Sequence, residues 1–121
     1  MRKIEQQYQV ALVSWFGLSY PKFANLLIQI PNEGKRSLVG NVIMKRMGLK
    51  KGASDLFLSV PSSGYHGFFI ELKQKGKKPT KEQYQFIENV KGVGYKAEWY
   101  DDWVLAKNDI VLYICKVKSS N

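Results

Sequence analysis

The chain has 121 residues, 45% of them hydrophobic and 24% charged, a composition typical of one soluble globular domain. It excludes a disordered chain, a collagen-like repeat and a coiled coil, and no apolar run is long enough to span a bilayer. Nineteen Lys and Arg against ten Asp and Glu give a formal net charge of +9, which points to a polyanionic partner, most often nucleic acid.

Hydrophobic periodicity and turn residues predict eight helices and strands. They are a helix over 3–17, a strand over 26–30, a basic helix over 37–47, strands over 55–60 and 65–73, a helix from Thr80 to Val90, a strand over 95–99, and a last helix that begins at Asp101 or Asp102. The predicted inward positions of the basic helix are Leu38, Val42, Ile43 and Met47. This order predicts an α/β fold, a mixed sheet of about four strands with helices on both faces.

The cations gather in two segments. Residues 35–51 contain six Lys and Arg residues, and no acid lies between Glu33 and Asp55. The second segment, 73–81, contains five lysines. Solvated loops are the ordinary interpretation of such runs, but both segments flank Asp55 and Glu71. A phosphodiester enzyme needs this pattern, because cations hold the backbone while carboxylates hold metal.

Three side chains within the predicted strands carry the chemistry. Asp55 begins one strand, and Glu71 and Lys73 lie two apart on the next, so these two leave the same face of the sheet. If the two strands are antiparallel neighbours, the carboxylates can converge on Mg²⁺ or Mn²⁺, while Lys73 orients water or neutralises charge on a phosphate. A Glu71–Lys73 ion pair at an exposed strand end is an equally good interpretation of these residues alone.

The ordered motifs of the chain resemble a known nuclease family. Asp55 followed, after a hairpin, by Glu71-Leu72-Lys73 resembles the PD-(D/E)XK nuclease motif. The segments 30–36, 45–61, 64–73 and 79–95 together resemble the VRR-NUC domain, the virus-type replication-repair branch of that superfamily. The resemblance runs from Glu5 to about Tyr113 and implies a single nuclease domain over 1–121 with a restriction-endonuclease-like core. The position before Asp55, often proline in the motif, is Ser54 here.

The resemblance implies roles for individual residues. Asp55, Glu71 and the backbone carbonyl of Leu72 would bind Mg²⁺ or Mn²⁺, Lys73 would be the lysine of the motif, and Glu5 would complete the metal site. From the sequence alone, Glu5 is better interpreted as an ordinary acid stabilised by the helix macrodipole. It does share a side of its helix with Leu12 and Phe16, which points it partly inward.

Gln83 has two interpretations. The run Thr80-Lys-Glu-Gln83 is a capping box, in which the Gln83 side chain returns to the Thr80 backbone. The resemblance instead places a glutamine at this position near the active site. Because the two roles require different side-chain directions, we favour the cap.

The resemblance also brings the basic segments to DNA, with Arg36 as a phosphate clamp. The expected DNA contacts are Asn32, Arg36, Lys45, Arg46, Lys50, Lys51, Lys75 and Lys77. The implied function is a metal-dependent DNA endonuclease. Stand-alone members of the branch work as homodimers, which favours branched DNA such as a Holliday junction or a flap. The alternatives are a basic nucleic-acid-binding module without catalysis and a nuclease acting on linear duplex DNA.

The expected location is cytoplasmic. The single cysteine, Cys115, fits a reducing compartment, and no secretory signal is visible. Small stand-alone members of the branch are typical of bacteriophages, in which case the protein would act in the host cytoplasm. No membrane partner is expected.

Overall fold

The computed structural model describes residues 3–31 and 38–118, with the backbone alone at 38, 39 and 41. Its elements are α1 (Lys3–Ser19), the 3-10 helix η1 (Pro21–Leu26), β1 (Leu27–Gln29), α2 (Leu38–Arg46), β2 (Leu56–Leu58), β3 (Phe68–Leu72), α3 (Lys81–Lys91), β4 (Lys96–Tyr100) and α4 (Trp103–Cys115). None of these helices is long and apolar enough to cross a bilayer.

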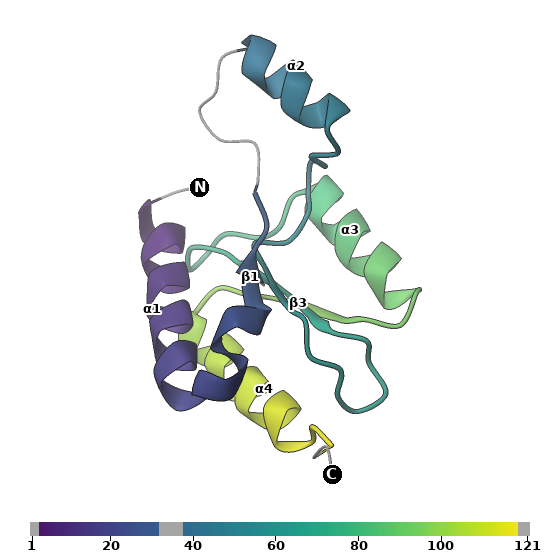
Figure 1. The fold of residues 1–121 in the computed structure, drawn as a ribbon. Coiled ribbons are helices and arrows are strands. Elements are labelled where there is room, and N and C mark those ends of the chain that lie inside the picture. The colour runs from purple at the N-terminus through teal and green to yellow at the C-terminus, as the bar shows by residue number, and fades with distance from the viewer. Residues whose placement is uncertain (1–2, 32–37, 119–121) are drawn as a thin grey trace.

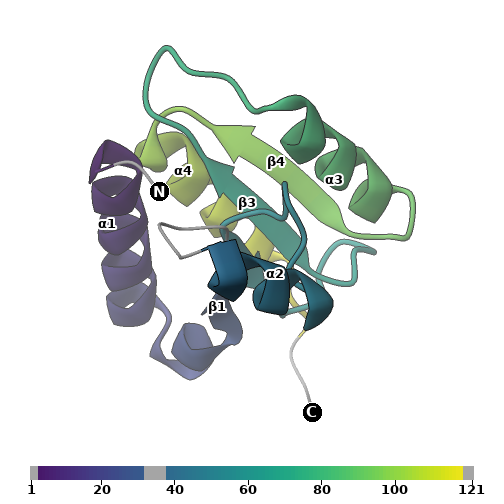
Figure 2. The same ribbon diagram turned by 90° about the horizontal axis from the view of Figure 1, so that it is seen from above.

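The four strands form one mixed sheet in the order β1-β2-β3-β4. The pairs β1–β2 and β2–β3 are antiparallel, whereas β3 and β4 are parallel. Parallel neighbours need a crossover connection, and α3 supplies it. The helices α1 and α4 cover one face of the sheet and α3 covers the other (Figures 1 and 2). The predicted α/β fold with a mixed four-stranded sheet is therefore confirmed.

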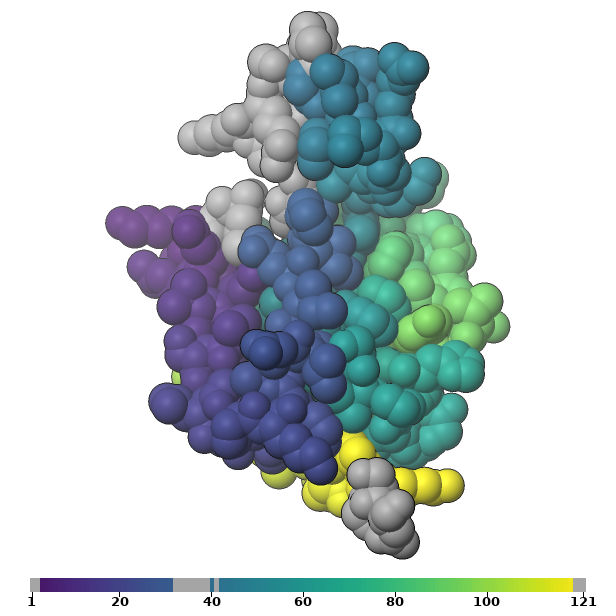
Figure 3. Space-filling model, viewed as in Figure 1, coloured from purple at the N-terminus to yellow at the C-terminus, as the bar shows by residue number. Residues whose placement is uncertain are grey.

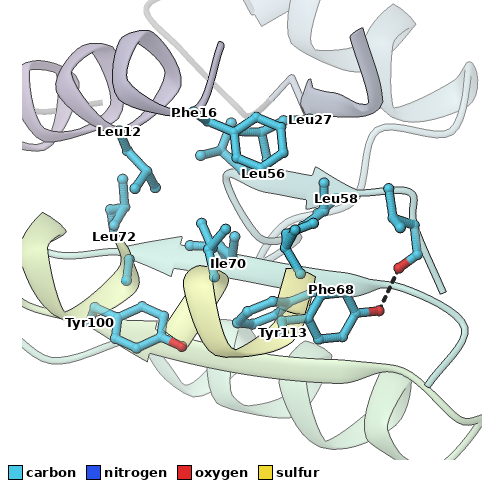
Figure 4. Packing of buried hydrophobic residues seen from close by; sticks show 14 residues of the cluster. Leu12, Phe16, Leu27, Leu56, Leu58, Phe68, Ile70, Leu72, Tyr100 and Tyr113 are labelled. Carbon is cyan, nitrogen blue, oxygen red and sulfur yellow. Dashed lines mark hydrogen bonds between the residues drawn. The ribbon is translucent and has the colours of Figure 1, made fainter. Parts of the chain in front are cut away.

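The main core lies between the sheet and the α1–α4 layer. Alternate residues of β3 point into it, and they meet Leu12 and Phe16 of α1 and Tyr113 of α4 (Figure 4). The hydroxyl of Tyr113 donates a hydrogen bond to the carbonyl oxygen of Val60 at 2.5 Å. Phe68, Ile70 and Leu72 are fully buried on this face.

The opposite face of the sheet carries the aromatic side chains of β2 and β3, and Glu71 follows them along β3. The rings of Phe57 and Phe69 stack with centroids 4.4 Å apart, and the ring of Phe86 from α3 meets Phe69 edge-on at 5.2 Å. Because side chains alternate along a strand, Glu71 leaves β3 on this same face. The alternation that fills the core therefore also points Glu71 towards α3.

The buried stripe of the first helix mixes polar and apolar side chains. Its buried side chains are Glu5, Gln9, Leu12 and Phe16, while Ile4 is 39% exposed. The 3-10 helix η1 was not predicted, and it takes Leu26 out of the predicted strand 26–30.

The observed strands β2 and β3 are shorter than the strands predicted over 55–60 and 65–73, because only part of each predicted strand pairs in the sheet.

Three of the four residues predicted to face inward from the basic helix are exposed, and the side chain of the fourth, Leu38, lies outside the described part of the chain. Val42, Ile43 and Met47 are 49%, 50% and 76% exposed. The helix makes no substantial contact with any other described helix or strand and stands clear of the sheet (Figures 1 and 3). Periodicity identified an apolar side of the helix, but it carries no information on whether the same chain covers that side.

Gly52 lies in the turn after α2, where its backbone packs against Glu82 at the beginning of α3. Its φ is +90°, and an added Cβ would lie 2.5 Å from the carbonyl oxygen of Glu82. We expect Gly52→Ala to lower the free energy of unfolding by about 2–4 kcal/mol, since backbone strain and a steric clash add. Gly48→Ala is the matched control, because Gly48 has φ +108° and open space around it. The control should lose only about 1–2 kcal/mol. Equal urea midpoints for the two variants would contradict the contact.

Candidate active site

Two carboxylates face each other where β2 begins and β3 ends. The antiparallel register pairs Leu56 with Ile70, so continuing it by one residue sets Asp55 opposite Glu71. Both side chains are buried, with 5% and 2% of their surfaces exposed. The expected antiparallel pairing of the two strands, which brings these residues together, is thus present.

Backbone groups at the end of β3 hold the pair in place. The N–H of Leu72 donates to Asp55 Oδ2 at 2.7 Å, and the N–H of Ile30 donates to the Asp55 carbonyl at 2.9 Å. Lys73 is fixed by its own N–H, which donates to the carbonyl of Tyr100 at 2.8 Å. Its Nζ lies 3.9 Å from Glu71 Oε2, and its side chain is only 11% exposed. The Glu71–Lys73 pair is therefore largely buried, and the interpretation as an exposed strand-end ion pair is wrong.

Gln83 forms the predicted helix cap and also reaches Glu71, so the prediction that the two positions require different side-chain directions is wrong. Its Oε1 accepts a hydrogen bond from the Thr80 N–H at 2.8 Å, and the Thr80 hydroxyl accepts from the Gln83 N–H at 3.2 Å. Its Nε2 donates to Glu71 Oε2 at 3.2 Å. One amide has an acceptor end and a donor end, so a single side-chain direction serves the helix cap and the carboxylate.

Glu5 reaches the same end of the molecule from α1. Its side chain is 8% exposed, and Oε2 accepts a hydrogen bond from the N–H of Gln74 at 3.1 Å. The first turn of α1 is thereby tied to the residue after Lys73. Glu5 is buried and hydrogen-bonded, as its shared side with Leu12 and Phe16 suggested, and it is not an ordinary solvated acid.

Burial and mutual repulsion disfavour the ionised forms of both central carboxyls. The pKa of Asp55 is raised by burial, an effect that the Leu72 N–H partly offsets. The pKa of Glu71 rises to about 9, first because of burial and then because of the Asp55 charge, with Lys73 acting in the opposite direction. Glu5 adds a smaller repulsion to both. With all three acids ionised, the single lysine would leave an excess of negative charge at this point.

The donor set fits a hard divalent cation. Glu71 Oε1 is buried and has no hydrogen-bond partner in the described part of the chain. A cation would satisfy this atom and remove the repulsion between the carboxylates. Within residues 3–31 and 38–118, no three acidic, histidine or cysteine side chains form a complete cage. Mg²⁺ does not require one, because it keeps several waters and takes one or two protein carboxylates.

The basic residues predicted to contact DNA fall into three groups. Lys45 and Arg46 are exposed in the last turn of α2, Lys50 and Lys51 are exposed in the turn that follows, and Lys75 and Lys77 are exposed in the turn after β3. The Nζ of Lys51 lies 3.9 Å from Glu82 Oε1, which draws its turn towards α3. Asn32 and Arg36 lie outside the described residues.

Two further polar side chains are buried, Gln9 on α1 and Ser54 directly before Asp55, and neither was assigned a role from the sequence. Gln9 Oε1 and Ser54 Oγ are buried without a hydrogen-bond partner among the described residues. Gln9 lies one turn after Glu5 on the same side of α1, so the helical spacing of 5, 9, 12 and 16 was a usable signal. For Ser54 the only signal was its place before Asp55.

The raised pKa of Glu71 predicts how the stability of the metal-free protein depends on pH. The folded chain holds this proton up to about pH 9, whereas the ordinary value is 4.5. Between these values the folded state binds more protons, so its stability is full below the lower value and falls as the pH rises. Glu71→Gln cannot ionise. We therefore expect a flatter dependence than in the wild type, and a higher stability near pH 8.

Urea unfolding in EDTA from about pH 5 to pH 9 measures this effect. Glu88→Gln is the matched control, because the Glu88 side chain is 70% exposed on α3. This control should keep the wild-type slope. A Glu71→Gln variant with the wild-type slope would show that the buried carboxyl does not take up the proton.

Comparisons with known proteins identify the family and the fold. The family model of the VRR-NUC domain matches residues 1–101. A solved structure described as a VRR_NUC domain protein is similar with a TM-score of 0.82 and 24% identity, over 96% of this chain and 92% of that one. No curated protein matches the chain. At this identity the structural likeness shows the fold, whereas the family model covers most of the sequence, and the chain therefore belongs to the VRR-NUC family of nucleases.

Proposed function

We propose that this protein is a DNA endonuclease that hydrolyses phosphodiester bonds with Mg²⁺ or Mn²⁺. Asp55 and Glu71 would hold the ion, with the carbonyl of Leu72 and the carboxylate of Glu5 completing the site. One observation carries the proposal: two buried carboxylates face each other, and one of them keeps an oxygen that has no hydrogen-bond partner among residues 3–31 and 38–118. Such a pair is costly to bury unless a cation joins it.

The bound ion would lower the pKa of water and stabilise charge on the phosphate. The chain's own residues prepare the site for it. Gln83 and Lys73 both lie at Glu71 Oε2, which fixes the carboxylate and leaves Oε1 directed elsewhere. The mostly buried ammonium of Lys73 would orient the attacking water and balance charge on the scissile phosphate. The Leu72 N–H holds Asp55 in its rotamer.

The substrate we propose is DNA with a branch, such as a four-way junction or a flap. The exposed lysines of α2, its following turn and the turn after β3 would bind phosphates, and such contacts give affinity without sequence specificity. Two copies in a homodimer would supply two active sites, which suits cleavage of two strands. A binding module without catalysis would have no use for two buried facing carboxylates. A nuclease for linear duplex DNA uses the same site and differs only in substrate.

Substitutions at the carboxylate pair and the lysine test the activity. We expect Asp55→Asn and Lys73→Ala each to slow cleavage of a labelled four-way junction in Mg²⁺ by about 100-fold or more. Lys22→Ala, an exposed substitution in η1, is the control and should cut normally. Site variants that cut as fast as the wild type would remove the assigned site. Unlabelled linear duplex should compete poorly, and strong competition would replace branched DNA by duplex as the substrate.

The two roles of Gln83 can be separated with a matched pair of variants. Thr80→Ala and Gln83→Ala each remove one hydrogen bond of the cap, so each should destabilise the protein by about 0.5–2 kcal/mol. Only Gln83→Ala also frees Glu71 Oε2. We expect it to slow cleavage by about 10- to 100-fold, with little change for Thr80→Ala. Equal cleavage rates for the two variants would show that Gln83 only caps the helix and does not contribute to cleavage.

A further inference from the structure

A groove runs between α3 and the turn that follows α2, and we call it the α3 groove. Its volume of about 420 Å³ lies in the range of pockets that bind small molecules. Glu82, Gln85, Phe86 and Asn89 line it from α3, and their spacing of three and four residues places them on one side of that helix. The remaining lining residues are lysines.

The two walls of the α3 groove are fixed to each other. The backbone of Gly52 approaches α3 so closely that an added Cβ would lie 2.5 Å from the carbonyl oxygen of Glu82. The Nζ of Lys51 lies 3.9 Å from Glu82 Oε1. The capping box of Thr80 and Gln83 fixes the beginning of α3. The groove is therefore preformed, and binding of a ligand requires little ordering of its walls.

The charge of the α3 groove favours an anionic ligand. Lys50 and Lys51 line it from the turn and Lys81 from the first turn of α3, and all three side chains are exposed. Glu82 is the only acid among the lining residues that the structure describes. Three ammonium groups against one carboxylate attract phosphate groups, which lysine binds as a point charge.

Two amide side chains give the groove a second kind of contact. Gln85 Nε2 donates a hydrogen bond to Asn89 Oδ1 at 3.0 Å, which fixes the two amides relative to each other. Within the described part of the chain, this bond leaves the Oε1 acceptor of Gln85 and the Nδ2 donor of Asn89 for a ligand. A phosphate offers acceptors alone, whereas the edge of a nucleobase offers a donor beside an acceptor. The amide pair therefore matches a base better than a second phosphate.

Phe86 adds an aromatic ring to the lining. Its side chain is half-buried, and its ring meets the ring of Phe69 edge-on at 5.2 Å. An aromatic ring is a surface on which bases of any identity stack. In a duplex the faces of a base are covered by its neighbours in the stack, so only an unpaired base is free to take this position.

The α3 groove lies beside the candidate active site, although neither Asp55 nor Glu71 lines it. Gln83, on the first turn of α3, donates a hydrogen bond to Glu71. Phe86 contacts Phe69, which leaves β3 on the same face as Glu71. A strand held in the groove is therefore on the face of the sheet where the carboxylates would cleave it.

We propose that the α3 groove binds an unpaired nucleotide of a DNA strand. The lysines bind its phosphates, Phe86 supports the face of its base, and the amides of Gln85 and Asn89 bind the edge of the base. The inference rests on the proposed function, and it adds a contact with a base to a DNA-binding surface that otherwise binds phosphates. It favours substrates in which one strand leaves the duplex near the scissile bond.

A larger groove at the other end of β2 lacks this combination. It has a volume of about 540 Å³ and lies between η1, the connection after β2 and the residues after α4. Lys116 and Lys118 supply positive charge there, but the lining that the structure describes contains no Asn or Gln side chain. The connection follows β2, whereas Asp55 precedes it, so this groove lies at the opposite end of β2 from the carboxylates.

Binding of a short labelled single-stranded DNA, measured by fluorescence anisotropy in EDTA, tests the α3 groove without cleavage of the strand. We expect Gln85→Leu and Asn89→Leu each to raise the dissociation constant about tenfold, because each removes a contact with the base. Asn108→Leu is the matched control, since Asn108 is also exposed on a helix but belongs to α4, on the other face of the sheet (Figure 2). The control should bind like the wild type. Unchanged binding by Asn89→Leu would overturn the proposal.

A strand that lacks its bases separates contacts with the base from contacts with phosphate. Abasic DNA of the same length should bind the wild type about tenfold more weakly than normal DNA, and Asn89→Leu should add no further loss. Lys50→Ala should weaken the binding of both strands by a similar factor, because it removes a phosphate contact. An abasic strand that binds the wild type as tightly as normal DNA would rule out the contact with the base.

The same measurements separate this inference from the nuclease proposal. A wild type that binds the strand through Gln85 and Asn89 but never cuts DNA would refute the nuclease and leave the groove standing. A wild type that cuts DNA in Mg²⁺, while Asn89→Leu binds the single strand as tightly as the wild type does, would refute the groove and leave the nuclease standing.

Discussion

The candidate site depends on the cost of ionising two carboxyl groups, Asp55 and Glu71, that are buried side by side across adjacent strands. Each is held by a directed hydrogen bond, from Leu72 and from Gln83, so neither can turn away to relieve the repulsion. The negative charge of the ionised pair can be removed in two ways, by uptake of a proton or by binding of a cation. A pair that is fixed so firmly favours a bound cation, and under the proposed function the neighbouring Lys73 would face the phosphate of the substrate.

Distinct parts of the chain converge on this pair for distinct physical reasons. The alternation of β3 directs Phe68, Ile70 and Leu72 into the core and Glu71 to the other face. The parallel pairing of β3 and β4 requires a crossover, and the helix of that crossover delivers Gln83. The first helix is joined to the end of β3 through Glu5. Core packing and site geometry are therefore consequences of the same strand register.

The sequence predicted the parts of this structure that depend on local pattern. The sheet, the convergence of Asp55 and Glu71, and the nearby Lys73 follow from period-two alternation and from the resemblance of ordered motifs. Gln83 was misjudged because sequence spacing shows that a cap exists but not where the other end of the amide points. The exposure of α2 could not be predicted, since an apolar helix side looks the same whether its own chain or another molecule covers it.

A crystal structure of the protein soaked in manganese tests the central claim most directly. The account predicts an anomalous peak bound by oxygens of both Asp55 and Glu71 at about 2.1 Å, with Gln83 still hydrogen-bonded to Glu71. Manganese bound elsewhere, with the two carboxylates directed apart in excess divalent salt, would contradict it.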